Sequence, residues 1–402
     1  MVDKIKKLLK LLLSSKIIFT KPKKSKIVLF DNTSLNDFKY ILKKKEYFLL
    51  VTRITKIKEI YVFPELFFLI IQNYRGNLAS SYFISILKTI NPKLVITFSD
   101  NSFKFSEISK ILEKKMKFVA IQNALRLDYI ENNYSFKNKI IKKNLNKKIY
   151  LPHIFTHGQY DIDLFKKLKI KIKRATKFGS LRLENALNYL KKKNINYSKK
   201  ENDICLISDT ILIAHFNGDK YKREKKLISN GMIRLAKYTI DFCRENKKKF
   251  IFVPKSKTKG KKRDIELKNY KKNLNFKDYL FLVNGIRKKY RNRHNQYLAM
   301  FRSKVTIGTT STLLGENLSQ GHKILSCNFT GIKVFDFAIN KICSLNNCSY
   351  TQFKKRLNYI FNLKEKKYFS LLSKRDKKYL VYSEPKFSRV ETLREKLKRL
   401  TL

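Results

Sequence analysis

A run of four hydroxyl residues is the clearest chemical feature of this 402-residue sequence. Thr309, Thr310, Ser311 and Thr312 directly follow Gly308, between a strand predicted at 305–307 and a helical pattern. The first amides of a helix have no partner within the helix, and the helix dipole favours negative charge there. The run therefore predicts a site for an anion such as a phosphate group. A plain helix N-cap is the other interpretation, although one cap needs only one hydroxyl.

Two carboxylates are expected beside this turn. Glu316 comes four residues after Thr312 and could accept hydrogen bonds from sugar or ribose hydroxyls. Asp209 follows a strand predicted at 203–207, and parallel strands bring the residues after them to a common sheet edge. A basic run at 255–263 is either a solvated loop or a source of positive charge for a diphosphate. The predicted donor-binding residues are Gly308, Thr309, Thr310, Ser311, Thr312, Glu316 and Asp209.

A second group of polar residues follows the strands predicted in the first half of the chain. Asp31 and Asp100 each come shortly after a predicted strand, so either carboxylate could take the proton of an acceptor hydroxyl as a general base. Amides, an imidazole and a guanidinium could orient sugar hydroxyls or a phosphate. The predicted acceptor or substrate-binding residues are Asn101, Gln122, Asn123, Arg126 and His157. Taken singly, Asp-Asn and Gln-Asn pairs are also ordinary turn formers.

Short apolar runs alternate with longer helical patterns, which is typical of βαβ units and parallel sheets. The sequence therefore predicts an α/β fold with two Rossmann-like, doubly wound domains facing a cleft and a helical C-terminal tail. Strands are expected at 26–30, 47–52, 59–62, 94–98, 118–121, 154–156, 175–178, 203–207, 250–253, 279–282, 305–307 and 323–326. A polar stretch at 191–202 predicts a linker. The expected parts are a basic amphipathic N-terminal helix (1–25), an acceptor-side domain (26–190), a donor-binding domain (203–345) and a C-terminal helical segment (350–402).

The order and spacing of these motifs resemble a known group of proteins. The predicted strand, the turn after Gly308, Glu316 and Gly321 resemble the donor-site unit of transferases with the GT-B fold. More specifically, residues 26–329 resemble bacterial surface-carbohydrate biosynthesis proteins of lipopolysaccharide and capsule loci. The pattern expects glycine where Ala124 stands, which weakens the case for a close approach of that loop's backbone to a ligand. The matching residues of the first half are Thr97, Asp100, Asn101, Phe103, Gln122, Asn123, Arg126, Thr156-His157-Gly158 and Gly179-Ser180-Leu181-Arg182.

This resemblance implies a metal-independent glycosyltransferase of surface polysaccharide or lipopolysaccharide biosynthesis. It would use a nucleotide sugar as donor, a glycan or lipid-linked acceptor, and no cofactor. A sugar-nucleotide epimerase or a polyol-phosphate transferase would keep the fold and change the reaction. A non-catalytic protein that binds an anionic polymer is an alternative of another class. The sequence lacks GxxxxGKS/T and GxGxxG motifs and clustered metal ligands, which disfavours an ordinary ATPase, a nicotinamide enzyme and a fixed zinc site.

The formal net charge of +60 comes from 91 Lys and Arg against 31 Asp and Glu. The lysines are spread along the chain and accompany abundant Ile, Asn, Phe and Tyr, as the codon bias of an A/T-rich genome would produce, so we predict no specific nucleic-acid partner. The N-terminal helix and the basic tail at 364–398 could rest on an anionic membrane surface. No stretch is long enough to span a bilayer, and the five spaced cysteines predict reduced thiols. The expected location is cytoplasmic, with possible peripheral binding to the inner face of the membrane.

Overall fold

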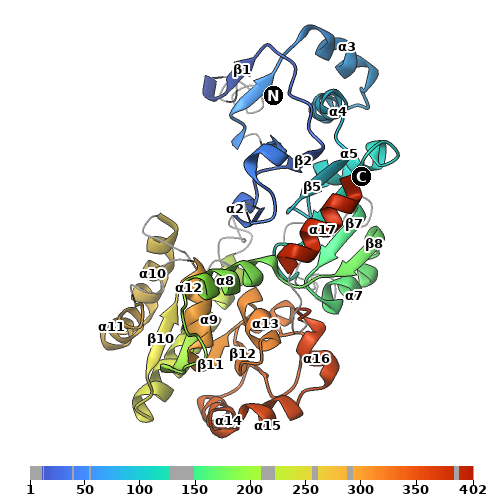
Figure 1. Ribbon diagram of the computed structural model, residues 1–402. Coiled ribbons are helices and arrows are strands. Elements are labelled where there is room, and N and C mark those ends of the chain that lie inside the picture. Colours follow the sequence, from blue (N-terminus) through green and yellow to red (C-terminus); the bar gives the residue numbers. More distant parts are fainter. Residues whose placement is uncertain are drawn as a thin grey trace.

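A computed structural model of the chain describes residues 11, 13–38, 40–53, 56–126, 149–209, 222–255, 261–287, 293–383 and 389–401. Each half of the chain builds one main parallel sheet with helices around it (Figure 1). A small lobe with strand β1 (Lys16–Ile18) and helix α3 (Pro64–Gln72) lies at the end of the molecule away from the second sheet (Figure 1). The predicted α/β fold with two doubly wound domains is confirmed.

The first sheet has six parallel strands in the order β3-β2-β5-β6-β7-β8. Strands β2 and β5 are buried along their whole length, because they are apolar runs covered on both faces. One face is covered by helices α4 (Leu78–Ile90), α5 (Phe103–Leu112) and α7 (Gln159–Lys167). The other face is covered by α2 (Leu35–Phe38), the start of α8 (Leu181–Lys192), and α17 (Arg389–Thr401). The strands are β2 Ile27–Phe30, β3 Phe48–Leu50, β5 Leu94–Thr97, β6 Lys117–Ile121, β7 Tyr150–Thr156 and β8 Lys171–Lys177.

The second sheet has five parallel strands in the order β10-β9-β11-β12-β13. Helix α8 contributes Leu183 and Leu190 to the core of this sheet and thereby joins the two domains. All five cysteines of the chain lie in this half and are free and buried. The strands are β9 Asn202–Ile207, β10 Phe250–Val253, β11 Ser303–Gly308, β12 Ile324–Asn328 and β13 Ser344–Asn346. The helices are α9 Lys222–Glu245, α10 Lys261–Asn273, α11 Phe276–Asn284, α12 Arg293–Phe301, α13 Thr312–Ser319 and α14 Tyr350–Asn362.

Two elements of the second domain differ from the sequence-based expectation. Residues 279–282 lie in helix α11 and do not form the predicted strand. Their apolar run fits a strand or a helix, but the Asn275 side chain accepts a hydrogen bond from the Asp278 amide at 2.8 Å and caps a helix there. Strand β13 was not expected, because Ser344, Leu345 and Asn346 form no apolar run.

The predicted N-terminal helix does not extend over residues 16–25. Residues 16–18 form β1, which pairs in parallel with β4 (Glu59–Tyr61), and residues 19–25 are not helical. Ile17 and Ile18 are β-branched and Pro22 has no amide to donate, which disfavours a helix. Residues 1–10 and 12 lie outside the described residues. Among the residues that are described, no helix has the length and apolar character needed to cross a membrane.

The C-terminal segment is shared between the two domains. Helices α14, α15 (Glu365–Ser370) and α16 (Lys374–Tyr379) follow the second sheet, whereas α17 packs on the first sheet through Leu393 and Leu397 (Figure 1). At the crossing, the Tyr382 amide donates a hydrogen bond to the His157 carbonyl at 2.8 Å. A Cβ atom on Gly158 would lie 2.3 Å from the Tyr379 carbonyl oxygen, so the crossing requires glycine at this position.

Candidate active site at the carboxyl edges of the two sheets

The hydroxyl turn lies where the sequence placed it, between β11 and α13. Gly308 ends the strand in a crowded position, since a Cβ atom there would lie 3.3 Å from the Leu314 side chain. The amides of Thr309 and Thr310 are occupied: both donate to Oδ2 of Asp209, at 3.2 and 3.1 Å. The Asp209 carboxylate, just after β9, therefore occupies the amides of the turn that a bound phosphate would otherwise use.

Lys255 places a positive charge beside this carboxylate. Its Nζ lies 3.4 Å from Asp209 Oδ1 and 3.5 Å from Ser311 Oγ. The Lys255 amide donates to Glu266 Oε1 at 3.0 Å, which fixes the start of the loop after β10. One member of the basic run at 255–263 is thus directed to the turn, while residues 256–260 lie outside the described part of the chain.

Ser311 and Thr312 begin helix α13. Ser311 is the N-cap residue, but its side chain makes no capping hydrogen bond to the helix. The Thr312 hydroxyl accepts a hydrogen bond from the Leu125 amide at 3.2 Å. The Leu125 side chain would be 3.0 Å from a Cβ atom on Gly315, so it packs closely on α13. Because Leu125 follows β6, the carboxyl edges of the two sheets meet at this point.

Glu316 connects three helices. Its Oε1 accepts a hydrogen bond from the Ser180 hydroxyl, and its Oε2 accepts one from the Tyr297 hydroxyl at 2.8 Å. The side chain is buried, with 1% of the residue exposed. The sequence led us to expect Glu316 on donor hydroxyls, whereas here it links α13 to the N-cap of α8 and to α12.

Asp31 is held by an arginine at the carboxyl edge of the first sheet. Arg53 Nε lies 2.5 Å from Asp31 Oδ2, and its Nη2 donates to Ser99 Oγ at 3.1 Å. Asp31 has a φ of 78°, in the left-handed region, and its Oδ1 accepts a hydrogen bond from the Asn32 amide at 2.8 Å. This local bond helps an aspartate to adopt that conformation.

Asp100 has a similar partner. Arg126 Nε donates to Asp100 Oδ2 at 2.9 Å, and Arg126 Nη2 donates to Oδ1, so the guanidinium binds the carboxylate through two nitrogens. The Asp100 side chain is 1% exposed and the Arg126 side chain 22% exposed. At both acidic positions the arginine is therefore the group more open to solvent, since the Arg53 side chain is 47% exposed.

Gln122 and His157 hold the loops of β6 and β7 together. The Gln122 side chain accepts a hydrogen bond from the His157 amide at 2.7 Å and donates to the Ala124 carbonyl at 2.9 Å. Both residues are buried. Of the other predicted residues, Asn101 is exposed and Asn123 is half-buried. Gln122 thus positions the loop that carries Arg126.

Asp161 was missed by the sequence analysis. It lies in the first turn of α7, fully buried, and its Oδ1 accepts a hydrogen bond from the Arg126 amide at 3.1 Å. Its Oδ2 has no hydrogen-bond partner among the described residues. Burial, with a smaller contribution from the nearby charge of Asp100, raises the pKa of the Asp161 carboxyl to about 7. An acidic residue in the first turn of a helix is common, so the sequence carried no distinguishing signal.

The described residues contain no group of three or more His, Cys, Asp and Glu side chains placed to hold a metal ion. Lys255, Arg53 and Arg126 place positive charge at the carboxyl edges of the two sheets. These three side chains and the start of α13 could bind phosphate groups on either side of the contact between Leu125 and Thr312.

Comparison with solved structures identifies the fold class. The wall teichoic acid polymerase TagF superposes with a TM-score of 0.52 at 10% identity, over 100% of this chain and 98% of that one. The UDP-GlcNAc 2-epimerase of Methanocaldococcus jannaschii, solved with UDP-GlcNAc and UDP, gives 0.51 at 11% identity, over 94% of this chain and 100% of the other. The Neisseria meningitidis UDP-GlcNAc 2-epimerase, bound to UDP-GlcNAc, gives 0.51 at 12% identity with the same coverage.

The chain therefore has a two-domain, GT-B-like fold. At these identities the likeness concerns the fold. No protein-family model matches the sequence, and no curated protein sequence matches it.

Proposed function

We propose that this protein is a glycosyltransferase-like enzyme of surface polysaccharide or lipopolysaccharide biosynthesis. It would transfer a sugar from a nucleotide-activated donor to a glycan or lipid-linked acceptor. The observation that carries the proposal is the unit formed by the β11–α13 turn, Asp209 and Lys255, which meets the first sheet's edge at Leu125. In the GT-B fold, ligands are expected at the carboxyl edges of the two sheets.

The donor diphosphate would bind at the turn. Lys255 Nζ and the first amides of α13 would carry its negative charge, and the Ser311 hydroxyl would donate a hydrogen bond. Asp209 now accepts hydrogen bonds from the Thr309 and Thr310 amides. A phosphate that took these amides would displace the Asp209 carboxylate, because two anions cannot share them. In this assignment, protein cations and not a metal ion stabilise the negative charge of the leaving diphosphate.

The acceptor would bind at the first sheet's edge. Its hydroxyl oxygen attacks the anomeric carbon, the bond from that carbon to the diphosphate oxygen breaks, and the hydroxyl proton passes to a carboxylate. Asp100 is the proposed base and Asp31 the second candidate. Arg126 occupies both Asp100 oxygens. An acceptor phosphate that drew Arg126 toward itself would free Asp100 to receive the proton. The enzyme would act in the cytoplasm, at the inner face of the membrane where lipid-linked acceptors lie.

Binding of nucleotide sugars to the purified protein tests the donor site. We expect a UDP-, GDP-, CMP- or CDP-linked donor to raise the melting temperature. Lys255→Ala should weaken the binding of that donor about tenfold or more, because a charge-assisted hydrogen bond is lost. Lys272→Ala, which removes an exposed lysine of α10, is the matched control and should bind normally. Unchanged affinity in both Lys255→Ala and Ser311→Ala would show that the donor binds elsewhere.

Product analysis with the donor that binds then identifies the reaction. Transfer to an acceptor with release of the nucleoside diphosphate supports the proposal. Conversion of the donor to its epimer without an acceptor, or transfer of a polyol phosphate, would replace it. In the same assay, Asp100→Asn should retain donor affinity and lose turnover by a factor of about a hundred or more. If Asp31→Asn shows this behaviour and Asp100→Asn does not, Asp31 is the base.

A further inference from the structure

Helix α3 exposes apolar side chains that ordinarily lie inside a protein. Phe67 and Phe68 are 68% and 69% exposed, and their rings contact each other at a centroid distance of 6.4 Å. Only Leu66 of this helix is fully packed, on the core of the first sheet. We define the lobe's apolar surface as Val62, Phe67, Phe68, Ile71, Tyr74 and Leu78, which are all exposed.

Ile17 of strand β1 and Phe19, just after the strand, belong to the same lobe and are 40% and 73% exposed. Large exposed apolar patches of this kind mark sites of association. A helix that is apolar all round is expected to be covered on every side, and α3 has the sequence Pro-Glu-Leu-Phe-Phe-Leu-Ile-Ile-Gln. The lobe also stands at one end of the molecule, where a flat partner can reach it (Figure 1).

The charge of the lobe identifies its partner. Residues 13–26 and 56–79 contain eight Lys or Arg and two Glu. Lys24 and Lys26 also line a cavity of about 400 Å³ at the edge of the first sheet opposite the candidate site, whose other charged residues are Lys45, Arg394, Lys398 and a single acid, Glu46. A partner must therefore be both apolar and anionic.

A second copy of the chain does not meet this requirement. It would bring an equally basic lobe against the first one, and like charges repel. Residues 1–10 of the same chain carry four lysines and one aspartate, so they offer the same sign of charge. A bilayer with anionic headgroups supplies both an apolar interior for aromatic side chains and negative charge for the lysines around them.

We propose that the lobe is a docking surface for an anionic lipid bilayer, with Phe67, Phe68 and Ile71 inserted at the boundary between headgroups and acyl chains. The inference rests on the proposed location of the enzyme at a membrane and is independent of the reaction it catalyses. It would hold the first domain, where the acceptor is proposed to bind, against the membrane surface.

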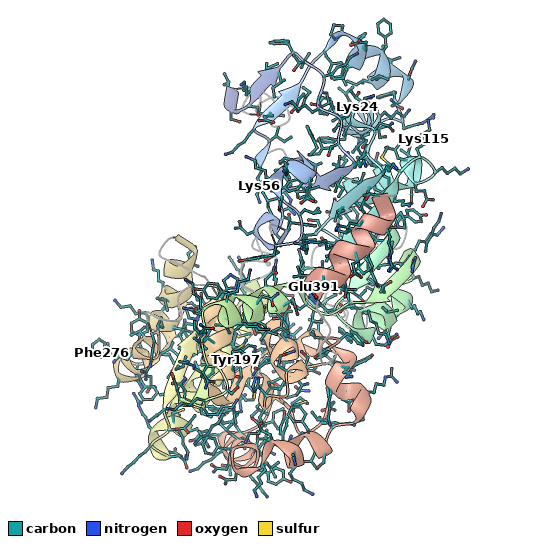
Figure 2. The ribbon with its side chains drawn as sticks, in the orientation of Figure 1. Lys24, Lys56, Lys115, Tyr197, Phe276 and Glu391 are labelled. Atoms are coloured by element: carbon teal, nitrogen blue, oxygen red, sulfur yellow. The ribbon has the colours of Figure 1, made fainter. Side chains whose placement is uncertain are left out.

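A single tryptophan reports on insertion, because the natural sequence has none. Phe67→Trp should show a blue-shifted emission with vesicles containing phosphatidylglycerol, and quenching by brominated acyl chains. Phe276→Trp is the matched control: Phe276 is 72% exposed and lies in the second domain, far from Lys24 of the lobe (Figure 2). The same shift at both positions, or at neither, would overturn the proposal.

Loss of the apolar side chains tests their contribution. The triple variant Phe67→Ser, Phe68→Ser, Ile71→Ser should lower the fraction bound to phosphatidylglycerol vesicles by about tenfold or more. A control triple variant, Ile265→Ser, Phe276→Ser, Leu280→Ser, removes exposed apolar groups of the second domain and should bind like the natural chain. Binding should weaken with salt and with pure phosphatidylcholine.

Three results would contradict the proposed surface. The first is unchanged vesicle binding by the α3 triple variant. The second is loss of vesicle binding when residues 1–10 alone are deleted from the natural chain. The third is a fall in oligomeric state, but not in vesicle binding, when the α3 residues are changed. The affinity of each variant for nucleotide sugars, measured without vesicles, separates this outcome from failure of the proposed reaction.

Discussion

At the scale of single residues, the first sheet's edge is built from buried carboxylates with different partners. Asp31 and Asp100 are each bound by an arginine that is more exposed than the carboxylate itself. Asp161 accepts the backbone amide of Arg126 at Oδ1 and lies beside the Gln122 side chain, while its Oδ2 has no partner in the described structure. Asp161 is therefore the carboxyl whose charge this site tolerates least.

Asp161→Asn should change how stability depends on pH. Because the Asp161 pKa is raised to about 7 in the folded state, from 3.8, the native protein holds a proton that the unfolded chain releases between pH 4 and 7. Wild-type stability should fall across this range, and Asp161→Asn should remove that loss, on the order of a few kcal/mol. Urea unfolding at pH 4.5 and 7.5 measures it. Asp163→Asn, on the same helix, is the control, and equal pH dependence of Asp161→Asn and wild type would show that Asp161 ionises normally.

The sequence was sufficient to locate groups that follow strands. Asp100, Arg126, His157 and Asp209 lie at carboxyl edges because parallel strands end together. It could not give the pairing of Asp100 with Arg126, because that depends on how two loops direct their side chains toward each other. Asp161 resembled any acidic residue in a first helical turn.

At the scale of elements, Ser180 has two functions. Its hydroxyl oxygen accepts the Leu183 amide at 3.2 Å and caps α8, and its hydroxyl donates to Glu316 in α13. The sequence predicted the helix that carries Glu316 and the strands on either side of it, but apolar patterns carry no information about which polar groups link helices. The same limit explains the error at 279–282, where the apolar run fitted either element and the Asn275 cap decided for a helix.

Ser180→Ala should destabilise the protein more than the loss of a helix cap alone. Ser102 caps α5 in the same way, by accepting the Phe105 amide at 3.2 Å, so Ser102→Ala measures the cap at about 1 kcal/mol. Ser180→Ala also removes a donor from buried Glu316, which should add about 1–2 kcal/mol. Denaturant unfolding compares the two. If Ser180→Ala combined with Glu316→Gln destabilises by the full sum of the single variants, the two residues do not interact.

At the scale of the whole molecule, the core of the first domain includes helix α17, which follows the second domain in the sequence. Leu393 and Leu397 of α17 are buried against β2 and β5, and Arg394 donates to the carbonyls of Ile41 and Tyr40 at 3.1 and 2.9 Å. The tail predicted as one helical segment thus ties the two domains together at Gly158 and His157.

Leu393→Ala should lower the free energy of unfolding by about 2–5 kcal/mol, because it leaves a cavity under α17. Hydrogen exchange should become faster in β2 and β5, although these strands are far from residue 393 in the sequence. Leu371→Ala, which shortens an exposed side chain just after α15, should change stability by about 0.5 kcal/mol or less. Faster exchange confined to α17 would show that the helix is not part of the first domain's core.

The position of α17 also sets the order of events during synthesis. A ribosome completes β5 at Thr97 but does not reach Arg389 until the whole second domain has been made. At about 5–20 residues per second, the face of the first sheet formed by Leu29 and Ile96 waits roughly 15–60 s for its covering helix. During this interval the nascent first domain presents an open apolar strip, which is a natural target for chaperones and a risk for premature association.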